Sequence, residues 1–149
     1  MANEEQRREL VSATEQNEIS RAVLIWLNSY EEKPKKVDFE YLGKTSGLCL
    51  SVVQAAFKTR QYVLGGYQAQ FQFQVVYRLI ADDVNKRLKA DEDLNKMGEW
   101  METNIASLSL PAGIVNERIR RDMAAALMAR YDNTAEDHSI SMTLTYEVI

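Results

Sequence analysis

Residues 65–77, GGYQAQFQFQVVY, alternate between glutamine and apolar side chains after a pair of glycines. Successive side chains of a β-strand point to opposite faces, so this period of two predicts a strand with two different faces. One face is apolar and is expected in the core: Ala69, Phe71, Phe73, Val75 and Tyr77. The other is an uncharged ribbon that can hydrogen-bond: Gln68, Gln70, Gln72 and Gln74. Such a ribbon suits contact with another protein better than it suits catalysis.

The composition is that of an ordinary globular protein. The chain has 149 residues, of which 46% are apolar and 27% charged, and we expect a single domain over residues 1–149. No apolar run approaches the roughly 20 residues that cross a bilayer, and the charged N-terminus does not begin a secretory signal. We therefore expect no membrane contact and a protein that stays in the cytoplasm where it is made.

The charge pattern argues against a broad nucleic-acid-binding surface. The formal net charge is −4, whereas such surfaces depend on clustered Lys and Arg that displace counterions from phosphates. The short basic runs Lys33–Lys36 and Arg118–Arg121 have acids nearby. We interpret both runs as solvated faces or loops.

The pattern along the chain predicts an α+β fold in which a mixed or antiparallel β-sheet is flanked by two main helices. The first helix is expected to begin at the capping box Ser12–Glu15, to carry an apolar stripe as far as Tyr30 and to end before Pro34. Residues 1–10 either extend this helix into solvent or form a loose arm. The acidic pair at 82–83 is expected to cap a short helix ending at Lys89, and the second main helix is expected from Asp91 to Asn104.

Strands are predicted where short-period apolar and β-branched patterns occur: 37–41, 48–54, 57–64, 67–79 and 139–149. The Gly65-Gly66 pair is expected to form a tight turn or a bulge. The segment 114–131 is ambiguous. Its alanine-rich centre favours a helix by propensity, yet the flanking sequence is compatible with an extended arm.

Two local patterns resemble catalytic or ligand-binding motifs but lack the residues that the chemistry requires. Gly43-Lys44-Thr45 resembles the end of a phosphate-binding loop, but Asp38 stands where that motif needs its first glycine, and a surface turn is favoured. His138 is the sole histidine and follows the polar run 132–137, so we expect an exposed loop side chain.

The other polar groups also favour structural roles. Cys49 is the only cysteine, which excludes an intrachain disulfide, and its leucine neighbours place it in the core. The clustered acids near residues 82–93 are best explained as helix caps. We therefore expect no enzyme activity, no catalytic residues, no cofactor and no metal site.

Four strings carry a resemblance to a known family: 38–43 (DFEYLG), the aromatic strand 67–79, 94–102 (LNKMGEWME) and the terminal strand 141–148. Together with the order of the elements, they resemble the tail terminator and head–tail joining proteins of long-tailed bacteriophages and prophages. This resemblance covers about residues 19–149. It implies that 119–131 is a strand that pairs with the last one.

The resemblance also implies a virion structural protein that forms a hexameric ring, caps the tail tube and joins it to the head. Its partners would be other copies of itself, the tail tube protein and a head-side connector or stopper protein, with DNA only passing through the lumen. The protein would lie in the host cytoplasm during assembly and then at the tail–head junction of the virion. A mild negative charge suits a channel through which DNA slides.

We expect the contacts with neighbouring copies and with the tube to use the glutamine ribbon and the arm before it: Arg60, Tyr62, Gln68, Gln70, Gln72 and Gln74. The alternatives are another head–tail connector or completion protein, a small dimeric adaptor, and a ligand-binding domain. The glutamines could also serve only to keep an exposed strand face soluble.

Overall fold

The computed structural model describes residues 9–149 and confirms the α+β class. The described chain forms a five-stranded mixed sheet with strand order β1-β2-β3-β5-β4, in which β1 is parallel to β2 and the other pairs are antiparallel. Residues 1–8 of the proposed N-terminal arm lie outside the described residues. The elements are α1 (Ala13–Asn28), β1 (Val37–Phe39), β2 (Gly47–Gln61), β3 (Tyr67–Ile80), α2 (Val84–Thr103), the 3-10 turn η2 (Ile105–Ser107), β4 (Ile114–Arg130) and β5 (Ala135–Val148).

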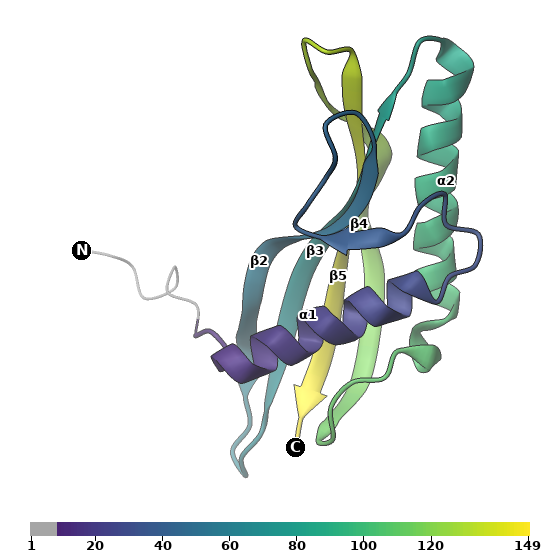
Figure 1. Cartoon of the computed structure of the whole chain (residues 1–149). Coiled ribbons are helices and arrows are strands. Elements are labelled where there is room, and N and C mark those ends of the chain that lie inside the picture. The colour runs from purple at the N-terminus through teal and green to yellow at the C-terminus, as the bar shows by residue number, and fades with distance from the viewer. Residues whose placement is uncertain (1–8) are drawn as a thin grey trace.

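Both helices cover the same face of the sheet. In Figure 1, α1 crosses the strands while α2 runs alongside them. Their buried apolar residues form one core cluster with the inward side chains of β3 and β5. The burial of β3 confirms the prediction that the strand has two different faces. Ala69, Phe71, Phe73 and Val75 are fully buried, whereas the alternating glutamines are only half-buried. The opposite face of the sheet carries no helix (Figure 1).

The Glu15 carboxylate in the first turn of α1 links the helix to the sheet through hydrogen bonds. Ser12 caps the helix as predicted, its hydroxyl accepting a hydrogen bond from the Glu15 amide at 3.2 Å. The Glu15 carboxylate then accepts hydrogen bonds from the hydroxyls of Tyr67 and Tyr146, the latter at 2.7 Å. Burial, followed by these contacts with Glu15, raises the pKa of both tyrosines. Helix α1 is thereby held to both central strands.

Two predicted interruptions are wrong. The strands expected at 48–54 and 57–64 are one strand, β2, whose broken alternation reflects register shifts between Val52 and Gln54 and between Gln54 and Phe57. The two helices expected after Ile80 are one helix, α2, capped by Asp83. No helix-breaking residue separates its two halves, so the acids in its middle lie on helical turns rather than at a second start.

The ambiguous segment 114–131 is a strand. β4 pairs with β5 from Ile114 to Arg130, and this long-range pairing outweighs the helical propensity of the alanines. The strand is irregular in the alanine run, where its register shifts. There the amide of Ala125 donates to the Asn95 side chain of α2 at 2.9 Å, so the helix satisfies a backbone group of β4.

The Gly65-Gly66 pair forms a tight turn between β2 and β3. Both glycines have positive φ, +91° and +80°, and a Cβ on Gly66 would lie 2.3 Å from the Val148 carbonyl oxygen. The side chains of Val63 and Leu64 at this turn are fully exposed. The hairpin extends beyond the rest of the sheet (Figure 1).

Candidate functional site

The face of the sheet without helices presents rows of uncharged polar side chains. The four glutamines of β3 stand opposite Glu147, Thr145, Thr143 and Ser141 of β5 in the antiparallel register. Opposite residues of an antiparallel pair share a face, so amides and hydroxyls lie side by side across the two central strands. We call this surface the amide–hydroxyl face. The hydroxyl row was visible in the sequence as the alternating Ser and Thr of 139–147.

Most of the hydrogen-bonding capacity of the glutamines is unused within the described chain. The side chains of Gln70, Gln72 and Gln74 form no hydrogen bond with residues 9–149. Gln68 differs, because its side-chain oxygen accepts a hydrogen bond from Thr59 at 3.0 Å. The remaining donors and acceptors are available to water or to a partner.

Arg60 and Tyr62 lie at the rim of this face near the hairpin turn. Arg60 is exposed and pairs with Gln68 across β2 and β3. Tyr62 follows the end of β2, and its pKa is raised by burial and by the charge and hydrogen bond of Glu147. The structure therefore places the four glutamines on one face of the sheet and puts Arg60 and Tyr62 at the hairpin end of that face.

The two edges of the sheet differ in the described chain. β4 has a neighbour only on the β5 side, and β1 covers only Leu48–Leu50 of the much longer β2. Beyond β1, the outer side of β2 is partly covered as far as Lys58 by backbone hydrogen bonds with residues 9–11 and by the side chains of Gln16 and Glu40. Exposed apolar side chains lie on or beside both edges: Met123, Leu127 and Met128 on β4, and Phe39 and Val53 on β1 and β2. Exposed edges of this kind are templates for pairing with another chain.

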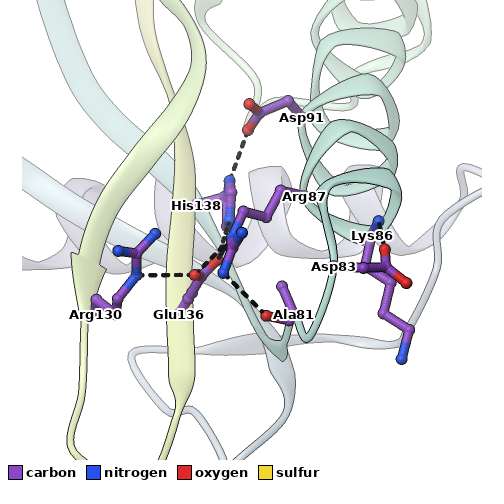
Figure 2. Close-up of polar contacts among 8 residues, drawn as sticks. All are labelled: Ala81, Asp83, Lys86, Arg87, Asp91, Arg130, Glu136 and His138. Carbon is purple, nitrogen blue, oxygen red and sulfur yellow. Dashed lines mark hydrogen bonds and ion pairs between the residues drawn. The ribbon is translucent and has the colours of Figure 1, made fainter.

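A buried ionic cluster lies where α2 meets the β4–β5 hairpin, and it corrects the prediction that His138 is an exposed loop residue. Glu136 accepts hydrogen bonds from Arg87 at 2.8 Å and from Arg130 at 2.9 Å, as Figure 2 shows. Nε2 of His138 lies 3.2 Å from Glu136, and Nδ1 lies 2.7 Å from Asp91. Glu136 and His138 are each 1% exposed. β5 begins four residues earlier than predicted, so these side chains point from a strand toward α2.

The chemistry of this cluster is that of a structural contact that holds α2 against the β4–β5 hairpin. Both ring nitrogens of His138 face carboxylate oxygens, and the cluster contains no hydroxyl or thiol nucleophile. Burial alone would raise the pKa of Glu136, but hydrogen bonds from Arg87, His138 and Arg130 outweigh it and leave the pKa lowered. Asp91 is therefore a partner of His138, not the helix cap expected from the sequence.

Asp137 repeats this arrangement on the other face of β5. Its carboxylate accepts hydrogen bonds from Arg78 at 2.7 and 2.8 Å and from the Tyr131 hydroxyl at 2.7 Å. Burial opposes ionisation, yet the contacts with Arg78 and Tyr131 leave the pKa of Asp137 lowered. Arg78 also donates to the Gly43 carbonyl at 3.1 Å and so holds the 40–46 loop.

We predict that the protein loses stability in acid through Glu136 and Asp137. Their pKa values are lowered in the folded chain, so their stabilisation is complete above the unfolded pKa of about 4 and is lost as the pH falls through the folded pKa. Urea unfolding at a series of pH values from neutral to acid measures this. The variant Asp137→Asn should show a shallower acid decline, and an unchanged decline would contradict the assignment.

Cys49 and the 43–45 turn offer no reactive group. Burial raises the pKa of the Cys49 thiol to about 11, so it stays protonated near neutral pH. Gly43-Lys44-Thr45 lies between β1 and β2, and a strand rather than a helix follows it. The backbone amides of a helix N-terminus, which a phosphate-binding loop uses, are therefore lacking at this turn.

Comparison with models of known protein families finds no match, and comparison with curated proteins finds no significant sequence similarity. Within residues 9–149, no helix is long and apolar enough to cross a membrane. The same part of the chain has no group of three or more His, Cys, Asp or Glu side chains arranged to hold a metal ion.

Proposed function

We propose that this protein is a tail terminator of a long-tailed phage, a structural subunit that closes the tail tube as a hexameric ring and joins it to the head. The observation that carries the proposal is the sheet itself, which has one face free of helices and uncharged in its centre, and a long edge strand, β4, open for pairing. The protein would assemble in the host cytoplasm and remain at the tail–head junction, between the tail tube protein and a head-side connector or stopper.

The open edge of β4 supports head-to-tail pairing of copies. β2 and β5 run in one direction and β3 and β4 in the other, so β4 of one copy would lie antiparallel to the β1–β2 side of the next, where the end of β2 after Lys58 has no strand neighbour on its outer side in the described chain. Contact between two different surfaces of one chain makes a ring when the rotation closes. The exposed apolar side chains on and beside both edges would be buried in this contact.

The helices support a particular curvature of the ring. α1 and α2 thicken one face of the sheet, so a closed ring of such sheets would carry the helices outside and the amide–hydroxyl face inside. The end with Arg60, Tyr62 and the exposed Val63 and Leu64 would form one flat side of the ring. That side is suited to contact with the tail tube.

The double variant Gln70→Glu/Gln72→Glu tests the role of this face. We expect it to fold normally but not to assemble, because two added carboxylates per copy would gather on the lumen wall, where their mutual repulsion opposes closure of the ring. Light scattering measures the mass, and circular dichroism measures the fold. The matched control Asn17→Asp/Asn85→Asp adds the same charge at exposed helix positions and should assemble. Normal assembly of the glutamine variant would overturn the assignment of this face.

A dimeric adaptor is the second candidate, because β4 is a 17-residue edge strand with exposed methionines and could pair with its counterpart in another copy. Such pairing is isologous and stops at two copies. A concentration-dependent mass of two chains would favour this candidate over the ring.

A further inference from the structure

A groove on the amide–hydroxyl face departs from the overall acidic character of the chain. It has a volume of about 430 Å³, and its lining includes Arg118, Arg120, Thr59, Gln70, Thr143 and Thr145 but no carboxylate. The chain as a whole has a formal net charge of −4. From the sequence, the Arg118–Arg121 run is expected to be a solvated face or loop. In the sheet, Arg118 and Arg120 instead stand beside the threonines of β5.

The arginines of this groove are available to a ligand. Arg118 is exposed and forms no ion pair with any residue in 9–149. Arg120 pairs with Asp122 at 3.0 Å on the same strand, and the Asp122 carboxylate also accepts a hydrogen bond from the Thr143 hydroxyl, so Arg118 is the arginine of the groove without an ion pair. Arg60 lies across the face on β2, also exposed and without an ion pair in the described chain.

The uncharged side chains of the groove supply further donors. The Gln70 amide makes no hydrogen bond within residues 9–149, and the Thr145 hydroxyl likewise has none there. Guanidinium, amide and hydroxyl groups all donate to phosphate oxygens. Arg118 and Arg120 are two residues apart on one strand, a separation of about 7 Å, which spreads their charges along a ligand rather than onto a single small anion.

We propose that this groove contacts the phosphate backbone of double-stranded DNA. The proposal rests on the ring described above, which would set one such groove from each copy on the wall of the lumen. DNA would then be held by repeated arginine contacts as it passes, in place of a purely repulsive channel. Because these contacts reach only phosphates, binding should be independent of base sequence and should weaken steeply with salt.

Fluorescence anisotropy with a labelled DNA duplex tests the groove on the full chain. We expect the wild-type protein to bind at low salt, and we expect Arg118→Ala/Arg120→Ala to bind more weakly and to reduce the slope of log K against log[salt] by about two. Arg118→Lys/Arg120→Lys keeps both charges and should retain most of the salt slope. Arg21→Ala removes an exposed charge from α1 and should bind as the wild type does. Thermal melting checks that each variant is folded.

Several results would overturn the proposal: no binding of DNA by the wild type at low salt, equal weakening by the Arg21 and groove variants, or groove variants that bind as the wild type does. Titration with inorganic phosphate distinguishes a site for the DNA backbone from a site for free phosphate. If phosphate displaces DNA only at concentrations that also screen charge, the result supports a site for the DNA backbone. Tight binding of phosphate without binding of DNA contradicts the proposal. Light scattering on the wild type tests the hexameric ring separately. If the protein binds DNA through the groove but forms no ring, the groove assignment holds and the ring proposal is wrong.

Discussion

The substitution Glu136→Ala is expected to lower the free energy of unfolding by about 2–3 kcal/mol, because it removes the buried carboxylate that accepts charged hydrogen bonds from two arginines. Arg87 and Arg130 would lose their shared acceptor, and Nε2 of His138 would face a cavity. Glu136 is 1% exposed, but the side chains of Arg87 and Arg130 are 38% and 58% exposed, so water replaces part of the lost carboxylate contacts. Urea unfolding at neutral pH, followed by circular dichroism, measures the effect.

A surface carboxylate gives the matched control. Asp82 pairs with Lys86 at 2.7 Å, but both side chains are more than half exposed. Asp82→Ala should therefore cost much less unfolding free energy than Glu136→Ala. If Glu136→Ala lowered the free energy of unfolding no more than Asp82→Ala does, the cluster would not be what holds α2 against the β4–β5 hairpin.

Phe71→Ala is expected to cost about 3–5 kcal/mol of unfolding free energy, because it opens a cavity in the layer between the sheet and the helices. Phe71 is fully buried, and its ring lies 5.6 Å from that of Phe73. Because the helices cover only one face of the sheet, this layer is the main core of the described chain. Thermal and urea unfolding of the variant give the cost.

Gln70→Ala, one residue earlier, tests the other face of the same strand. Its side chain is half-buried and makes no hydrogen bond within residues 9–149, so the substitution should change stability by about 0.5 kcal/mol or less. A large loss from Gln70→Ala, or a small one from Phe71→Ala, would contradict the division of β3 into a core face and an interaction face.

The features that follow from local sequence were predictable. The strict alternation around Phe71 predicts β3 and its two faces, and the capping box at Ser12 predicts the start of α1. The terminal alternation predicts β5, although its start is misplaced by four residues. In each case one local signal, a periodic pattern or a helix cap, is strong enough to decide the structure.

The features that depend on distant partners could not be predicted. Glu136 and His138 lie in a run that has the polar composition of a loop, and their partners Arg87 and Asp91 are 47 to 49 residues away in the chain. The strand β4 is set by pairing with β5 against its own alanine propensity. The charge of the groove at Arg118 emerges only when β4 and β5 place arginines beside threonines.

The solution mass of the purified chain, measured by light scattering coupled to size exclusion with negative-stain images of the same fraction, tests the ring most directly. We expect a particle of six 17.1 kDa chains that appears as a closed ring with a central channel. A mass that stays at one or two chains over the whole accessible concentration range, with no rings in the images, would contradict it.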